Sequence, residues 1–461
     1  MWELMWNCSS QLVIIMNLNK RDFFINLVLL LLIILLLIQA GFLWISFSMP
    51  NKVEDLVFKS EDASMDVFMP SMLVVNLGYR EHYVLRNFKD YWKLYSSDIS
   101  EILENASSEN LIMIDEKTYL NLQNKKSLVF KFSSPISASI LINLIGENKK
   151  DNNINLSINS IYISDDNDVY LCASNNFYKL LGLKTNLKMN RLIDNAKNLG
   201  TRYINFFERY GIYKDTLIPD SDFIKTQKIY YNIATDALTD DIRNNLAVRY
   251  LQTDLDYIKE IKQSEKTSYV YENKYISFNK NGIVEYSNEE EFNVTDRNLY
   301  TSIITALEFL SRNSGMTSNV YLDSTKPIEY KGSLGYKFFF NLRESGKNLV
   351  LNSKDNSFIE MDVFSNHVKF YREYYFKRAD DPSYNELRVK VLDIKTIIDR
   401  NLKIFPQEKT EDILNLLNNL SIVYINESTT DSSKLKLAYE LLINGKKYYF
   451  DISLGKLILI R

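Results

Sequence analysis

The feature that most constrains this chain is an apolar run from Phe23 to Phe47, near the start of a sequence of 461 residues. At about 1.5 Å per residue, a helix of this length reaches roughly 37 Å, which crosses a ~30 Å hydrocarbon core with some tilt. The stretch from Leu27 to Ile38 is apolar on every side. The absence of a polar stripe disfavours burial in a soluble core. We therefore expect residues 23–47 to form a single transmembrane helix.

The residues that flank this run predict its orientation. Lys20 and Arg21 lie just before it, and no basic residue follows until Lys52. Because basic residues are enriched on the cytoplasmic side of a span, we expect residues 1–22 in the cytoplasm and the rest of the chain on the extracytoplasmic side of the cell membrane. A cleaved signal peptide is the main alternative. It would need a small-residue cleavage site, whereas the sequence from Trp44 to Pro50 offers bulky residues.

Four residues in the outer half of the run are candidates for partner binding. Gln39 is the only amide there, and it precedes the small residues Ala40 and Gly41. Both residue types recur at contacts between transmembrane helices. Trp44 lies where an interfacial aromatic side chain belongs. The alternative is that Gln39 and Gly41 simply lie near the outer interface, and the sequence leaves both readings open.

Composition limits what the remainder of the chain can be. A length of 461 residues with 46% hydrophobic and 25% charged residues is enough for two or three domains with real cores. The formal net charge of −3, with both signs interspersed, argues against nucleic acid as a partner. The two cysteines, Cys8 and Cys172, are expected on opposite sides of the membrane, so no disulfide framework is expected. We interpret Cys172 as a small buried hydrophobic residue.

Hydrophobic periodicity predicts an α+β fold with about three extracytoplasmic domains. The first, residues 48–265, is a mixed domain with short strands around a turn at Gly78 and a helix over 88–105. A further helical segment is expected to begin at Ser134 and to continue through Leu144. In this interpretation Pro135 lies in the first helical turn, where proline is tolerated.

Residues 266–378 and 379–461 are predicted to be two domains in which a helix packs on an antiparallel sheet. In the first of them, Asn281-Gly282 signals a hairpin turn, and apolar residues from Leu299 to Leu310 recur on one helical face. The second domain repeats this order in shorter form, with a hairpin turn at Asn444-Gly445. The repetition suggests duplicated modules, although a shared β-meander pattern alone would produce a similar likeness.

The groups that usually perform proton transfer and metal binding are scarce. The two histidines, His82 and His367, lie in separate strand-like segments, and the acidic runs at 165–168 and 289–291 lack the layout of a calcium loop. We therefore predict a non-enzymatic protein with no cofactor and no metal. A carboxylate pair for glycoside hydrolysis stays open, because Asp and Glu are abundant. An exposed aromatic patch around residues 371–376 that docks a protein or a glycan also stays open.

Four groups of segments together form a recognisable pattern. They are Tyr83-Val-Leu with Tyr91-Trp-Lys-Leu, Leu128-Val-Phe-Lys-Phe-Ser-Ser-Pro-Ile, Tyr275-Ile-Ser-Phe-Asn-Lys-Asn-Gly-Ile-Val-Glu-Tyr286, and Ala306-Leu-Glu-Phe-Leu followed by Gly315. On these segments the chain resembles the YycH family of membrane-anchored extracytoplasmic regulators. The resemblance runs from the anchor to near the C-terminus, and it matches a fold pattern rather than a catalytic signature. The extended N-terminus departs from the family, and similarity is low around residues 145–200.

What the resemblance implies is a regulator of a sensor histidine kinase of the WalK (YycG) type, which controls cell-wall metabolism. Its single membrane helix would contact the helices of the kinase, commonly together with a sister protein that resembles YycI. The resemblance transfers no binding residue to this chain. From the residues alone, a cell-envelope polysaccharide-binding protein or hydrolase is the alternative, and self-association of the chain stays open.

Overall fold

The chain divides into two compact units, Met1–Phe58 and Lys59–Arg461, which are described separately. The computed structural model describes residues 66–461 with gaps at 108, 146–155, 174–175, 185–188, 228, 234–237, 314–318, 353–356, 379–385 and 427–432, and before them residues 23, 25, 28–29, 31–36 and 39.

In the first unit, the described positions between Phe23 and Gln39 are helical and their side chains are exposed. Among the described residues of the whole chain, no helix is both long and apolar enough to cross a membrane. Much of the predicted span 23–47 lies outside the described residues, so the anchor stays a prediction.

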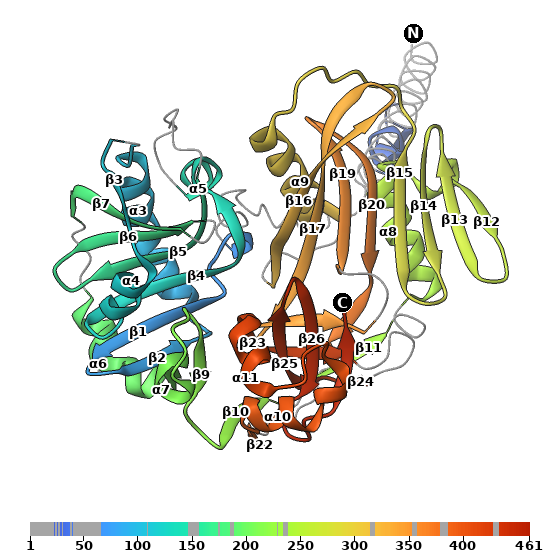
Figure 1. Cartoon of the computed structure of the whole chain (residues 1–461). Helices are drawn as coiled ribbons and strands as arrows, with labels where there is room; N and C mark the ends of the chain where they lie inside the picture. The colour runs from blue at the N-terminus through green and yellow to red at the C-terminus, as the bar shows by residue number, and fades with distance from the viewer. Residues whose placement is uncertain are drawn as a thin grey trace, which may run out of the picture. The chain divides into compact units, whose positions relative to one another are not determined.

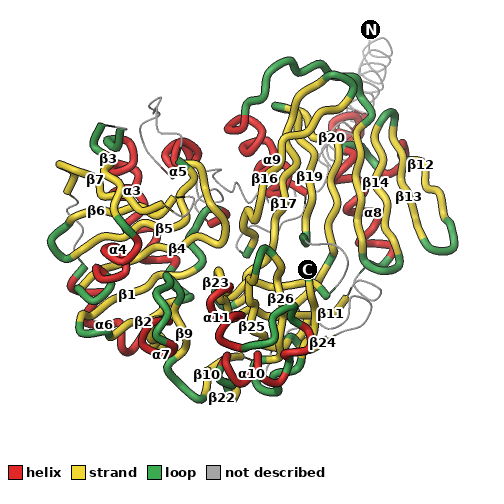
Figure 2. Tube along the Cα trace, viewed as in Figure 1, coloured by secondary structure: helices red, strands yellow, loops and turns green. Residues whose placement is uncertain are grey.

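The second unit has an α+β fold in which both large sheets carry helices (Figures 1 and 2). Its N-terminal lobe, residues 66–219, is built on a nine-stranded antiparallel sheet in the order β3-β7-β6-β5-β4-β1-β2-β8-β9. The strands are β1 (Met72–Gly78), β2 (Glu81–Leu85), β3 (Leu111–Ile114), β4 (Lys126–Ser137), β5 (Ser157–Ser164), β6 (Asp168–Ala173), β7 (Asn176–Lys184), β8 (Thr201–Asn205) and β9 (Leu217–Pro219). The helices are α3 (Lys89–Glu104), α4 (Glu116–Leu122), α5 (Ala138–Ile145), α6 (Asn190–Leu199) and α7 (Phe206–Tyr210).

Alternation along β4 decides which side chains reach the core and which face away from α3. Phe130 packs under α3, where its ring lies 5.9 Å from that of Trp92. Successive side chains of a strand point to opposite faces, so Lys131 lies on the other face of the sheet. There its strand neighbour is Ser160 of β5, which pairs in turn with Cys172 of β6. The face opposite α3 therefore carries polar groups in the middle of the sheet.

The C-terminal lobe, residues 238–461, is built on a 13-stranded sheet in the order β12-β13-β14-β15-β20-β19-β17-β18-β23-β25-β26-β27, with β16 paired to β17. The strands are β12 (Lys259–Lys262), β13 (Lys266–Tyr271), β14 (Lys274–Asn279), β15 (Ile283–Asn288), β16 (Val320–Tyr330), β17 (Ser333–Glu344), β18 (Lys347–Leu351), β19 (Ile359–Phe364), β20 (His367–Tyr374), β23 (Leu417–Asn426), β25 (Lys436–Ile443), β26 (Lys446–Asp451) and β27 (Leu457–Ile460). The helices are α8 (Asp240–Leu251), η1 (Leu255–Tyr257), α9 (Leu299–Asn313), α10 (Ile394–Arg400), η2 (Leu402–Ile404) and α11 (Thr410–Leu416).

Two small sheets join distant segments of the second unit. In one, β10 (Phe223–Gln227) pairs with β22 (Glu386–Lys390). In the other, β11 (Tyr230–Ile233) lies between β21 (Phe376–Arg378) and β24 (Ser433–Lys434). Both sheets tie the segment that follows the N-terminal lobe to strands near the end of the chain.

Several predicted elements are confirmed. Helix α3 matches the predicted helix over 88–105, and α9 buries Ile303, Ala306, Leu307 and Leu310 of its predicted apolar face. The hairpin turn at Asn444-Gly445 has positive φ at both residues, as a two-residue hairpin of this type requires. These features depend on local spacing and turn chemistry, which a sequence displays directly.

The predicted helix from Ser134 to Leu144 begins in the wrong place. Strand β4 continues to Ser137, and α5 starts only at Ala138. Pairing of β4 with β5 is interrupted between Lys131 and Ile136 and then resumes. Pro135 lies in this irregular stretch, where its missing N–H breaks no ladder hydrogen bond. The proline therefore marks an irregularity in a strand, not the first turn of a helix.

Strand pairing crosses each predicted domain boundary. Strand β12 lies before the boundary at 265/266 and pairs with β13 after it. The boundary at 378/379 is bridged by the parallel pair β18–β23. The division into domains 48–265, 266–378 and 379–461 stays a prediction about how the chain is organised.

Candidate functional site

A cavity of about 1050 Å³ lies between the two lobes of the second unit. One wall is the face of the nine-stranded sheet that carries Lys131, Ser160 and Cys172. The other wall comes from β16, β17, β18, β23, β25 and β26 of the C-terminal lobe. We call this cavity the interlobe cleft. A smaller cavity of about 30 Å³ shares several of its lining residues, among them Arg86 and Asp215.

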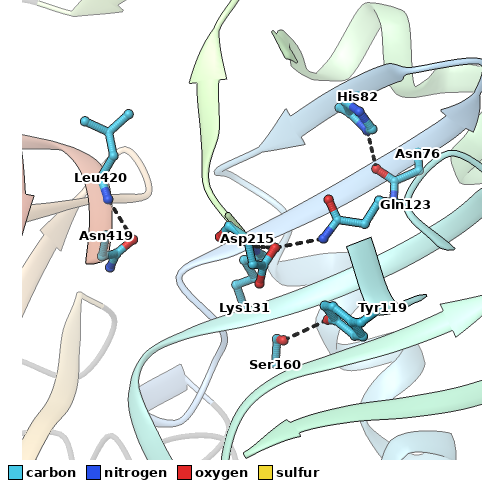
Figure 3. A network of polar contacts seen from close by, with 9 residues as sticks. All are labelled: Asn76, His82, Tyr119, Gln123, Lys131, Ser160, Asp215, Asn419 and Leu420. Atoms are coloured by element: carbon cyan, nitrogen blue, oxygen red, sulfur yellow. Dashed lines mark hydrogen bonds and ion pairs between the residues drawn. The ribbon is translucent and has the colours of Figure 1, made fainter. Parts of the chain in front are cut away.

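An ion pair organises the N-terminal wall of the interlobe cleft. Lys131 Nζ lies 2.7 Å from Asp215 Oδ1 and also donates to the Asp215 carbonyl at 3.2 Å. Gln123 Nε2 donates to the same carboxylate at 2.7 Å, so Asp215 is held from two sides (Figure 3). Both charged side chains are largely shielded from solvent. The pair therefore fixes the Lys131 ammonium at the cleft wall and neutralises the Asp215 charge.

The opposite wall approaches this ion pair through an irregular stretch of β23. Asn419 and Leu420 line the smaller cavity together with Lys131 and Asp215. Figure 3 shows Asn419 and Leu420 on a separate segment, across from Lys131 and Asp215. The pairing of β23 with β25 shifts register between Leu417 and Asn419, and Asn419 Oδ1 accepts from the Leu420 amide at 2.8 Å. The bulge turns the Asn419 side chain back onto its own strand and leaves room at the wall.

Polar contacts hold the two lobes together around the cleft. Lys214 donates to the carbonyls of Asn415 and Leu417, at 2.7 and 2.5 Å. Arg209 donates to Asp393, which caps α10. These bonds join side chains of the N-terminal lobe to backbone and side chains of the C-terminal lobe. Hydrogen bonds and an ion pair therefore join the two lobes beside the cleft.

Arg343 makes a further contact between the lobes from a buried position. It donates to the carbonyls of Met69 and Pro70, at 2.7 and 3.3 Å, and to Ser133 Oγ at 3.0 Å. Its guanidinium lies over the Tyr321 ring at 4.3 Å. Burial lowers the pKa of Arg343 to about 10, and the nearby positive charge of Arg86 contributes to that direction. Arg343 thus carries a buried charge that is bound by neutral acceptors.

Two carboxyl groups line the C-terminal wall of the cleft. Burial raises the pKa of Asp323, and the nearby charge of Glu440 acts in the same direction. Glu440 itself lies 3.6 Å from Lys447. The two carboxyl groups therefore differ in environment: burial dominates at Asp323, whereas Glu440 has Lys447 as a cationic partner.

His82 belongs to a buried network of the N-terminal sheet and does not line the cleft (Figure 3). Asn76 Nδ2 donates to Ser127 Oγ at 2.8 Å, so Asn76 Oδ1, 2.7 Å from His82 Nδ1, accepts from the ring. Burial first, and then the charge of Lys131, lower the pKa of His82 to about 4. The ring is therefore neutral at physiological pH and couples three neighbouring strands.

The residues predicted as partner-binding or topology-determining lie in the first unit. Gln39 is described and is helical and exposed. Ala40, Gly41 and Trp44, together with Lys20 and Arg21, lie outside the described residues, so their predicted roles are not tested.

Sequence reasoning missed the residues that line the cleft. One signal was present, because Lys131 interrupts the apolar run Leu128-Val-Phe-Lys-Phe. A charged residue inside a strand of this kind often faces a polar site. Cys172 is buried, as predicted, and burial raises the pKa of its thiol to about 11. This direction disfavours the thiolate and therefore a nucleophilic role.

Comparisons with known proteins identify no family. No protein-family model matches the chain, and no curated protein matches it. An uncharacterized protein from Eubacterium rectale ATCC 33656 is similar over 52% of this chain and 87% of its own, at 10% identity and a TM-score of 0.34. The C-terminal domain of Bacillus megaterium YpeB is similar over 49% of this chain and 97% of its own, at 12% identity and a TM-score of 0.26. Within the described residues, no group of three or more His, Cys, Asp or Glu side chains is arranged to hold a metal ion.

Proposed function

We propose that this chain is a non-enzymatic, membrane-anchored accessory regulator whose interlobe cleft binds a ligand or a segment of a partner. Residues 23–47 would anchor it to the cell membrane as a single-pass helix, with the described lobes on the extracytoplasmic side. The partner proposed on the resemblance to the YycH family is a sensor histidine kinase of the WalK type that controls cell-wall metabolism. A YycI-like sister protein is proposed to share that complex.

The observation that carries the proposal is the interlobe cleft of about 1050 Å³, whose walls come from both lobes. An occupant of this cleft would contact both walls at once. Its binding free energy would therefore depend on the relation between the lobes, and by linkage it would favour one arrangement over another. This is the property that a regulator needs in order to transmit binding to a partner.

The test combines the helix and the cleft in one reporter assay. Replacement of residues 23–47 by an unrelated spanning helix should weaken co-purification with the kinase. Filling the cleft by Ser421→Trp should change kinase output in cells, because Ser421 lines both cavities. Asn195→Trp, on the exposed face of α6, is the matched control and should leave output unchanged. Unaltered association and unaltered output in both test variants would refute the proposal.

A second candidate, a cell-envelope polysaccharide-binding protein or hydrolase, is favoured by one observation. Asp323 and Glu440 both line the cleft, and their charges interact. Acid–base hydrolysis of a glycoside needs two carboxyl groups of unequal proton affinity. Release of reducing sugar from purified cell-wall polysaccharide, abolished by both Asp323→Asn and Glu440→Gln, would support this candidate. An inactive wild-type protein would exclude it.

A further inference from the structure

The side chains of the interlobe cleft carry an excess of positive charge. Six Lys or Arg side chains line it, against four carboxylate side chains. Lys131 lies 2.7 Å from Asp215 and Lys447 lies 3.6 Å from Glu440, while burial raises the pKa of Asp323. Two of the four carboxylates are thus paired with lysines of the cleft, whereas Arg86 forms no ion pair among the described residues.

Arg86 is the centre of the uncompensated charge. It follows β2, is partly buried and lines both cavities. Among the described residues, none accepts a hydrogen bond from its guanidinium or forms an ion pair with it. A guanidinium offers five donors, and those of Arg86 are free to bind an anion that enters the cleft.

The turn between β17 and β18 fixes the C-terminal lobe directly against Arg86. A Cβ atom on Gly346 would lie 2.1 Å from the Arg86 carbonyl oxygen, and Gly346 has a φ of +70°. Only glycine allows both this approach and this backbone conformation. The flanking residues Arg343 and Lys347 are therefore held close to Arg86, so three cations from two lobes meet at one junction.

Burial, and then the like charge of Arg86, disfavour the protonated forms of the two cations from the C-terminal lobe. Burial lowers the pKa of Lys347 to about 8, and the charge of Arg86 lowers it further in the same direction, against an opposing effect of Glu344. The charge of Arg86 also lowers the pKa of Arg343. An arrangement of like charges that disfavours its own protonation binds an anion more favourably than an isolated surface cation does.

Neutral donors complete the junction. Ser133 of β4 and Asn348 of β18 both line the cleft, and each comes from a different lobe. Ser133 Oγ accepts from Arg343 at 3.0 Å and from Asn348 at 3.5 Å, which leaves its hydroxyl hydrogen for another acceptor. Lys131 is held at the same wall by Asp215.

We infer that this junction binds an oxyanion, a phosphate or carboxylate group, between Arg86 and Ser133 of the N-terminal lobe and Asn348 of the C-terminal lobe. This inference rests on the proposed role of the cleft as a binding site and names the chemical class of its ligand. The anion bridges the lobes, because its acceptor oxygens take hydrogen bonds from both walls. It also relieves the repulsion among Arg86, Arg343 and Lys347.

The test is isothermal titration of the full chain in detergent micelles with two probes, sodium tripolyphosphate and citrate. Saturable binding of either probe is expected, and the stronger probe distinguishes a phosphate from a carboxylate ligand. Arg86→Gln should weaken binding by about tenfold or more, since it removes a charge-assisted donor. Arg86→Lys should lose less, because it keeps the charge. Arg191→Gln, at an exposed position of α6, is the matched control and should bind as wild type.

A second variant keeps the test decisive if Arg86→Gln does not fold. Asn348→Asp is nearly isosteric and places a negative charge on the opposite wall, so it should also abolish binding. Absence of saturable binding to the wild type, or equal affinity of Arg86→Gln, Asn348→Asp and wild type, would overturn the anion site. Kinase output measured on the same variants separates the two claims. If the wild type regulates the kinase but binds no anion, only this inference is overturned. If it binds the anion but does not regulate the kinase, only the proposed function is overturned.

Discussion

Glu373 of β20 offers the sharpest test of the energetics of the C-terminal lobe. Its carboxyl group is 1% exposed and lies within a cluster of aromatic side chains. Tyr371 donates to it at 2.6 Å and Tyr250 at 3.3 Å. Burial raises the pKa of Glu373 from 4.5 to about 7, although both tyrosine hydrogen bonds act in the opposite direction. The protein therefore holds a carboxyl group in its core that prefers to be neutral.

The sign of the effect on stability follows from this direction. Between pH 4.5 and about pH 7, Glu373 loses its proton in the unfolded chain and keeps it in the folded protein. The contribution of Glu373 to the free energy of unfolding is therefore fully present at acid pH, and it is lost as the pH rises through the pKa of the folded protein. The difference between the two pKa values corresponds to about 3 kcal/mol. Above the folded pKa the loss is complete and no longer changes.

The perturbation is Glu373→Gln, which keeps an acceptor for Tyr371 and removes the titration. Urea unfolding of wild type and variant, followed by tyrosine fluorescence across this pH range, gives the difference in unfolding free energy. That difference should shift by about 3 kcal/mol in favour of the variant from acid to neutral pH. Any cost of the amide itself, about 1 kcal/mol, adds a constant offset. Glu308→Gln, at an exposed position of α9, controls for replacing a carboxylate in the same lobe. A difference that does not vary with pH would refute the reasoning.

Three further predictions follow from other contacts. Because burial lowers the pKa of His82 to about 4, wild type should lose stability as pH falls from 6.5 towards 4, and His82→Gln should lose less in acid urea titrations. Gly346→Ala should lower the melting temperature far more than Gly445→Ala, since both glycines have positive φ but only Gly346 faces a close backbone atom. Equal losses would show that the positive φ, and not the close contact with Arg86, sets the cost of the substitution. Arg343→Met should cost about 2–3 kcal/mol in urea unfolding, because it removes the donor to two buried carbonyls, and an unchanged midpoint would contradict this account.

Local elements of this fold could be predicted because their physical causes are local. The apolar face of α9 follows from spacing that matches the helical repeat, and the Asn444-Gly445 turn follows from residues that tolerate positive φ. The helix expected from Ser134 was wrong for the same reason. A proline in a first turn and a proline at an irregularity in a strand look alike until the neighbouring strand is known.

The candidate site could not be predicted, because it depends on contacts between remote segments. Arg343 binds the Met69 carbonyl across 274 positions of sequence. Arg86 of the N-terminal lobe faces the Gly346 turn of the C-terminal lobe, although the two residues are far apart in the sequence. No periodicity or motif in the sequence indicates such contacts between remote residues.

By itself the sequence determined the α+β character of the chain, several helices and turns, and the apolar run 23–47 on which the predicted anchor rests. Each of these is a property of neighbouring residues, whose side-chain period or backbone preference acts within a few positions. Only the tertiary structure decided that Arg86, Lys131, Ser133 and Asn348 share one cleft. The physical reason is that electrostatic and hydrogen-bonding environments are set by distance in space, and strand pairing creates that proximity after the local elements have formed.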